Sequence, residues 1–89
     1  MGGVTFEGGP GDTVETAVVI RGAADHLQGV AAEYRYLTSE FGRRGVDWQL
    51  EQQALLKVGG QYYDEMRLRL ADGTRQTVYF DLSEFFGRF

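Results

Sequence analysis

Three segments in the second half of the chain alternate between apolar and polar side chains, and glycine-containing turns separate them. They run from Trp48 to Val58, from Tyr62 to Leu70 and from Arg75 to Leu82. Alternation with a period of two is typical of strands that bury one face of a sheet. Gly59-Gly60 and Asp72-Gly73 favour tight hairpin turns between the segments. The sequence therefore predicts a three-stranded antiparallel meander.

The apolar residues predict the register of the second hairpin. A two-residue turn would set Leu70 opposite Arg75 and send the apolar sets of the two strands to opposite faces. A three-residue loop over residues 71–73 restores the match and pairs Met66 with Val78.

The same parity argument predicts a loop over residues 59–61 in the first hairpin, which closes Val58 on Tyr62 and sets Ala54 against Met66. The predicted core face of the meander then comprises Trp48, Leu50, Ala54, Leu56, Met66, Leu68, Leu70, Val78, Phe80 and Leu82.

Residues 24–41 predict one long helix, because apolar side chains recur there at spacings of three and four. Asp25 can accept backbone hydrogen bonds at the helix start, and Gly42 favours its end. The stripe expected to face the sheet consists of Leu27, Val30, Ala31, Tyr34, Leu37 and Phe41.

The first twelve residues hold five glycines and the single proline, which predicts a flexible glycine-rich arm over residues 1–12. As an alternative, residues 4–6 could add a short edge strand. Residues 13–21 are rich in β-branched side chains and predict a first strand. That strand could pair with either the second or the last strand of the sheet.

The predicted fold is therefore α+β, in a single domain over residues 13–89. Its four-stranded, mostly antiparallel sheet has the order β-α-β-β-β, with one long helix on one face and a short C-terminal helical turn near Ser83. A chain of 89 residues holds one hydrophobic core. We expect one or two of Phe85, Phe86 and Phe89 to fold back onto it.

Composition excludes several kinds of site. The absence of Cys rules out disulfides, thiolate metal sites and a cysteine nucleophile, and the single His rules out paired imidazole ligands. A net charge of −4 argues against binding double-stranded nucleic acid. The longest apolar stretch, residues 17–20, is far too short to span a membrane. We expect a cytoplasmic protein with no metal and no cofactor.

The outer face of the predicted sheet is the first candidate binding surface. Arginines beside aromatic rings suit carboxylate, phosphate or single-stranded nucleic-acid contacts. The alternative is a solvated face, on which Glu51, Glu65 and Asp81 pair with the arginines across strands. The candidate residues are Tyr63, Arg67, Arg69, Arg75 and Tyr79.

The helix side opposite the apolar stripe is the second candidate surface. Tyr36 is expected there, with the small residues Gly29 and Ala32 beside it. Small residues around an exposed aromatic side chain let another chain approach closely, which suits a homodimer or a partner helix. The alternative is a lone surface aromatic residue.

No catalytic residues are predicted. Asp64 falls on the predicted apolar face, opposite Phe80, where a desolvated carboxylate can act as a general acid. The alternative places Asp64 at the sheet margin, in contact with water.

The order of helix, meander and terminal turn over about residues 24–87 resembles double-stranded-RNA-binding domains and small toxin–antitoxin proteins. The basic residues of the second helix in RNA-binding domains are missing, since only Arg88 lies nearby. The resemblance therefore implies an element order and no function.

The leading hypothesis is a non-enzymatic protein-binding module of the inhibitor, immunity or adaptor type, whose partner is another protein or a second copy. One alternative is a small-ligand-binding or enzymatic domain that uses Asp64 in a pocket between helix and sheet. A weaker alternative is single-stranded RNA binding on the outer sheet face.

Overall fold

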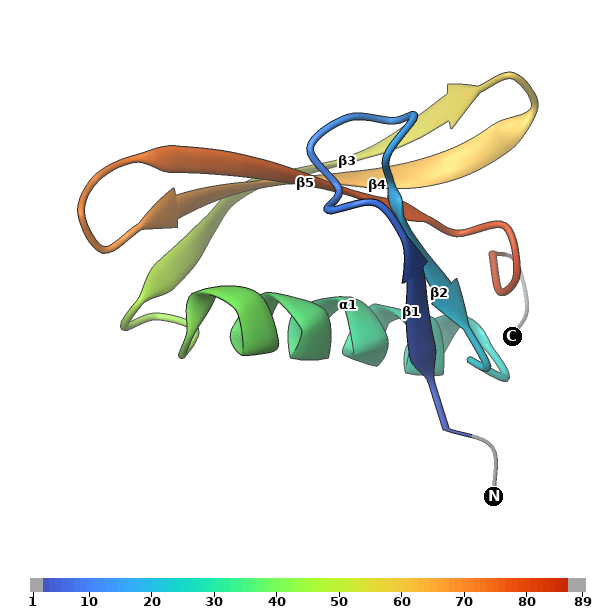
Figure 1. Cartoon of the computed structure of the whole chain (residues 1–89), viewed down its shortest axis with the longest axis horizontal. Helices are drawn as coiled ribbons and strands as arrows, with labels where there is room; N and C mark the ends of the chain where they lie inside the picture. Colours follow the sequence, from blue (N-terminus) through green and yellow to red (C-terminus); the bar gives the residue numbers. More distant parts are fainter. Residues whose placement is uncertain (1–2, 87–89) are drawn as a thin grey trace.

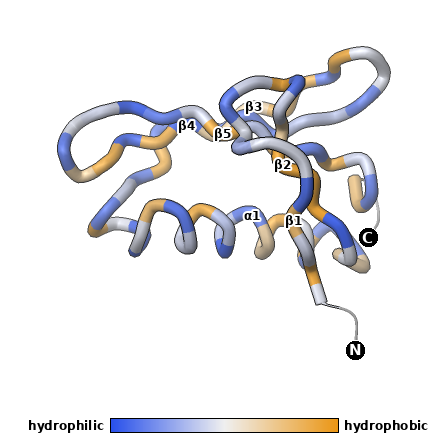
Figure 2. The backbone as a smooth tube through the Cα atoms, in the orientation of Figure 1, coloured by the Kyte–Doolittle hydropathy of each residue, from blue (hydrophilic) through white to orange (hydrophobic). Residues whose placement is uncertain are grey.

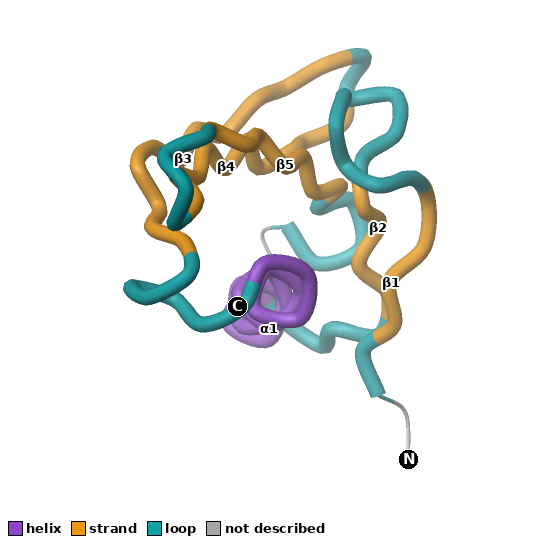
Figure 3. Tube along the Cα trace, turned by 60° about the vertical axis from the view of Figure 1, so that its left-hand side comes forward, coloured by secondary structure: helices purple, strands orange, loops and turns teal. Residues whose placement is uncertain are grey.

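The structure, a computed structural model, describes residues 3–86. Its elements are β1 (Thr5–Gly8), β2 (Val18–Arg21), α1 (His26–Phe41), β3 (Trp48–Val58), β4 (Gln61–Leu70) and β5 (Arg75–Asp81). The strands form one sheet in the order β1-β2-β5-β4-β3. The β2–β5 pair is parallel and the other neighbouring pairs are antiparallel. Helix α1 crosses one face of the sheet (Figure 1), and the sheet curves around it (Figure 3).

The α+β class is confirmed, but the sheet is five-stranded and mixed, so the four-stranded, mostly antiparallel prediction was wrong in these details. The additional strand is β1, which lies within the segment expected to be an arm. Its Phe6 ring lies 5.2 Å from the Tyr36 ring, between ring centroids. The strand whose partner was left open, β2, pairs with the last strand, β5.

The first predicted strand is shorter than expected and begins at Val18 instead of Thr13. Thr13 and Thr16 close a turn, in which the Thr16 amide donates to the Thr13 carbonyl at 3.2 Å. The Gly11 amide then donates to the Thr16 carbonyl at 2.8 Å. The Thr13 amide also donates to the Thr16 hydroxyl at 3.1 Å. Hydroxyl side chains that bind backbone groups in this way favour turns over strands. Figure 1 shows this loop on the side of the sheet away from α1.

Both ends of α1 follow the sequence signals. The Asp25 side chain accepts a hydrogen bond from the Gln28 amide at 2.9 Å, and Gly42 ends the helix with a φ of 103°. The indole N–H of Trp48 donates to the Gly42 carbonyl at 2.8 Å and so joins the helix end to β3. The helix begins at His26, two residues later than predicted.

The register of the β4–β5 hairpin is as predicted. Met66 lies opposite Val78, and Arg69 lies opposite Arg75. The loop over residues 71–73 contains Gly73 with a φ of 88°, the left-handed conformation that such a loop requires.

The register of the β3–β4 hairpin was predicted wrongly. Gly59 and Gly60 form a two-residue turn with φ of 58° and 81°, and Val58 lies opposite Gln61. Both central residues of a type I′ turn have positive φ, so this pair of glycines fits that turn.

A β-bulge between Leu50 and Gln52 restores the parity that the short turn would otherwise break. As a result, Gln53, not Ala54, lies opposite Met66. Beyond the bulge, Ala54 and Leu56 therefore belong to the outer face instead of the predicted core face. Gln53 and Leu55 take their place on the side of α1.

The core lies between α1 and the curved sheet. Figure 2 shows β2 as an apolar segment and alternating apolar and hydrophilic residues along α1. Phe85 folds back and is fully buried, as expected, while the Phe86 ring stacks on Tyr62 at 4.2 Å. The Phe86 amide donates to the Leu82 carbonyl and closes a single turn. Phe89 lies outside the described residues. The core cluster comprises Val18, Ile20, Ala23, Ala32, Leu37, Trp48, Met66, Leu68, Val78, Phe80, Leu82 and Phe85.

Candidate functional site

The helix face predicted to point outward faces the core. Ala32 and Gly29 are buried, and a Cβ at Gly29 would overlap the ring of Phe85. The Tyr36 ring packs edge-on against Phe80, with 5.6 Å between ring centroids. The expected outward position of these residues was therefore wrong, and they form no open groove for a second helix.

The helix is rotated about its axis relative to the predicted stripe. Leu27 is 77% exposed and Ala31 is also exposed, whereas Leu37 is buried as expected. The position that the hydropathy pattern misjudged is Glu33, whose side chain is fully buried. A prediction based on apolar residues treats a glutamate as exposed. It therefore assigned the neighbouring face of the helix, instead of the face with Glu33, to the core.

Glu33 on α1 and Asp64 on β4 bring two carboxyl groups together in the protein interior. Neither oxygen of Glu33 receives a hydrogen bond from an N–H or O–H donor among the described residues. Two carboxyl groups can hydrogen-bond only when one of them carries a proton. Burial, followed by the hydrogen bond to Asp64 and its charge, raises the pKa of Glu33 from 4.5 to about 10. Glu33 therefore holds a proton at neutral pH, and this proton makes a hydrogen bond to Asp64 possible.

Asp64 has a second partner on β3. The Gln53 side-chain amide donates to its carboxylate at 3.2 Å. Gln53 can reach Asp64 because the bulge turns it to the side of α1. The carboxyl pair thus joins α1, β4 and β3.

Three surface concavities of the described chain are lined by residues other than the carboxyl pair: one lies at the start of β3 around Trp48, one on the outer sheet face around Arg67, and one beside α1 around Ala31. Asp64 lines none of the three. The polar groups that interact with its carboxylate are those of Glu33 and Gln53.

The outer sheet face carries the three predicted arginines, each about half exposed or more. Glu51, the bulge residue, accepts from Arg75 at 2.8 Å and lies 3.9 Å from Arg69. Glu65 lies 3.2 Å from Arg67. Exposed pairs of this kind contribute little stability, but they fix the direction of the guanidinium groups.

The two tyrosines of this face differ in accessibility. Tyr63 is 9% exposed, and its hydroxyl donates to the Gln61 side chain at 2.8 Å. The hydroxyl of Tyr79 donates to Glu65 at 2.8 Å, and this hydrogen bond raises the pKa of Tyr79 above its ordinary value. Arg67 and Tyr79 help to line a concave region of about 370 Å³.

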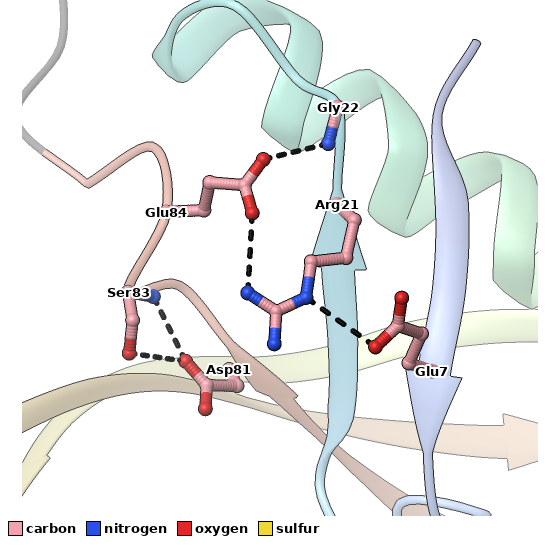
Figure 4. A network of polar contacts seen from close by, with 6 residues as sticks. All are labelled: Glu7, Arg21, Gly22, Asp81, Ser83 and Glu84. Atoms are coloured by element: carbon pink, nitrogen blue, oxygen red, sulfur yellow. Dashed lines mark hydrogen bonds and ion pairs between the residues drawn. The ribbon is translucent and has the colours of Figure 1, made fainter. Parts of the chain in front are cut away.

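The third acid expected on this face, Asp81, is occupied elsewhere. Its carboxylate accepts from both the amide and the hydroxyl of Ser83. Figure 4 shows this contact beside a second one, in which Glu84 accepts from the Gly22 amide at 2.7 Å and from Arg21 at 3.3 Å. Arg21 also donates to Glu7 on β1 at 3.4 Å. These contacts join β1, β2 and the C-terminal turn.

The open edge of the sheet at β3 was not among the predicted sites. Strand β3 has eleven residues and a single neighbour, β4, in the sheet of the described chain. Leu55 is 52% exposed and Val58 is 48% exposed on this strand. The core face predicted from the sequence contained Ala54 and Leu56 in this part of the strand, because the sequence pattern contains no sign of the bulge.

A scan against protein-family models found no match, and searches of curated proteins and of solved structures found none either. Over residues 3–86, His, Asp and Glu form no group of three or more that could hold a metal ion. The helix in this part of the chain is not long and apolar enough to cross a membrane.

Proposed function

We propose that the chain is a non-enzymatic protein-binding module whose partner contacts it along the open edge of β3. The observation that carries this proposal is the length of that edge together with the exposure of Leu55 and Val58. A long, uncovered edge strand with apolar side chains is a template for pairing with another chain.

The two-residue turn determines which backbone groups of β3 are available. In such a hairpin the closing pair, Val58 and Gln61, exchanges its backbone hydrogen bonds. Backbone groups then point alternately toward β4 and away from it. Gln53, Leu55 and Lys57 consequently present their N–H and C=O groups at the open edge.

The bulge limits the usable edge to residues 52–58. Bulges disrupt pairing and are one way in which edge strands avoid unwanted partners. The N-terminal part of β3, next to Glu51, is protected in this manner. The C-terminal part contains no proline and one charged residue, Lys57, so it has little protection.

The other hypotheses from the sequence have less support. Single-stranded RNA binding needs unneutralised positive charge, whereas Glu51 and Glu65 lie beside the arginines of the outer face. An acid–base function for Asp64 needs room for a substrate, whereas Asp64 lies against Glu33 and Gln53.

A photo-crosslinking amino acid at position 58 tests the proposal in the cells that produce the protein. We expect a discrete protein adduct from Val58. The same amino acid at position 27 is the matched control, since Leu27 is also an exposed apolar residue but lies on α1. Equal adducts from both positions, or none from position 58, would contradict the proposal.

A further inference from the structure

We propose that the occupant of the β3 edge is a second copy of this chain, whose β3 runs antiparallel across a two-fold axis at Leu55. This inference rests on the proposed protein-binding function and names the partner. A two-fold axis makes the contact self-complementary and closed, as in most soluble homo-oligomers.

The phase of the backbone groups restricts the register of such a pair. A residue whose backbone N–H and C=O groups lie at the open edge must pair with such a residue of the second copy. These residues have odd numbers on β3, so the numbers of two residues that lie opposite each other add to an even sum. An axis at Leu55 sets Leu55 opposite its own copy and Gln53 opposite Lys57. All three outward-facing residues of the unbulged segment then pair.

Neighbouring axes use this edge less well. An axis at Ala54 would set Lys57 opposite Glu51, the bulge residue, where the backbone pattern is interrupted. An axis at Leu56 would extend the pairing of Gln53 to Gly59, inside the turn. The axis at Leu55 avoids both interruptions.

Side chains on the paired segments are compatible in this register. The two copies of Leu55 face each other on the side of α1 and cover part of their exposed surface. Lys57 faces the neutral Gln53, so no like charges lie directly opposite. On the outer face, Ala54 faces Leu56, and Val58 faces Gln52 of the second copy.

The opposite edge of the sheet, β1, is less suited to pairing. It has four residues and ends at Gly8, whose φ is 86°. Short edge strands are a common protection against association. Because β3 is much longer than β1, we expect association through the β3 edge.

Light scattering on the purified chain over a range of concentrations tests the inference. The paired area is small, so we expect a monomer–dimer equilibrium with a dissociation constant on the order of 10–100 μM. Leu55→Lys places like charges across the axis and should raise that constant at least about tenfold. Leu27→Lys, the matched exposed leucine on α1, should leave it unchanged. A monomer at every concentration, or a dimer that Leu55→Lys leaves intact, would overturn the inference.

Disulfide trapping tests the register with smaller changes. The chain has no cysteine, so Leu55→Cys introduces a single thiol. Hydrogen-bonded antiparallel partners have Cα atoms about 5.5 Å apart, which suits a disulfide. Leu55→Cys should therefore oxidise to a covalent dimer faster than Ala54→Cys or Leu27→Cys. Equal rates for the three variants would overturn the register.

The results separate this inference from the proposed function. A monomeric purified chain that nevertheless gives a position-58 adduct with another protein would reject the homodimer and retain the binding module. The absence of both dimer and adduct would reject both proposals.

Discussion

At the scale of single residues, Glu33 lies on the face of α1 that meets the sheet and is fully buried there. A fully buried glutamate is costly when charged but acceptable when protonated and hydrogen-bonded. The sequence placed Asp64 on an apolar face correctly, but its partner lies far away along the chain. No local pattern could connect the two residues, so the helix rotation could not be predicted.

Glu33→Gln should change how stability depends on pH. The pKa of Glu33 is raised in the folded state, so the unfolded chain releases a proton that the folded chain keeps between pH 4.5 and about 10. The contribution of Glu33 to the free energy of unfolding is largest below this window and falls as the pH rises through it, by about 1.4 kcal/mol per pH unit. The neutral glutamine does not titrate and lacks this slope. The free energy of unfolding of the variant should therefore rise relative to that of the wild type from pH 5 to pH 8.

Urea denaturation at pH 5, 6, 7 and 8 measures this difference. Glu40→Gln is the control, since Glu40 lies exposed on the same helix. If Glu33→Gln follows the wild type in parallel at every pH, the shared proton between Glu33 and Asp64 is refuted.

Gly29→Ala should destabilise the protein, although alanine favours helices by about 1 kcal/mol. The added methyl group would overlap the buried ring of Phe85, and we expect a net loss of about 1–3 kcal/mol. Phe85→Leu removes the overlap, so the double variant should lose less than the sum of the single losses in thermal denaturation. Strict additivity would show that the two residues do not meet.

At the scale of elements, the two hairpins show what an alternating pattern can and cannot predict. In the β4–β5 hairpin, Met66 and Val78 belong to uninterrupted alternation, and parity gave the correct loop. In the β3–β4 hairpin the same reasoning failed, because a bulge at Glu51 corrects the parity in the middle of the strand. A bulge changes the face of every later residue and leaves no clear signal in side-chain chemistry.

Gly59→Asn should raise stability by about 0.5 kcal/mol, because Asn-Gly is a preferred type I′ pair and asparagine restricts the unfolded chain. A Cβ at either glycine meets no neighbour within 4 Å, so the backbone alone decides the effect. Gly60→Val should lower stability by about 1 kcal/mol or more, because its φ is 81°. Chemical denaturation of both variants checks the turn, and equal effects would argue against its assignment.

At the scale of the whole molecule, the topology creates the candidate site. The helix connects β2 to β3, which lies beyond β5 and β4 in the sheet, so β3 becomes an edge. The short β1 covers the edge of β2, whereas β3 has only β4 beside it among the described strands, apart from a bridge between Arg44 and Trp48 at its first residue. The sequence predicted the meander and the helix from local periodicity. The order of strands depends on distant contacts, such as those of Phe6 with Tyr36, which local patterns do not contain.

Amide hydrogen exchange along β3, followed by NMR at low and high protein concentration, tests the use of this edge most directly. The amides of Ala54 and Leu56 point toward β4 and should be protected at both concentrations. The amides of Gln53, Leu55 and Lys57 point outward, so they should exchange rapidly at low concentration and become protected at high concentration. Outward amides that exchange at the same rate at both concentrations would contradict pairing at β3.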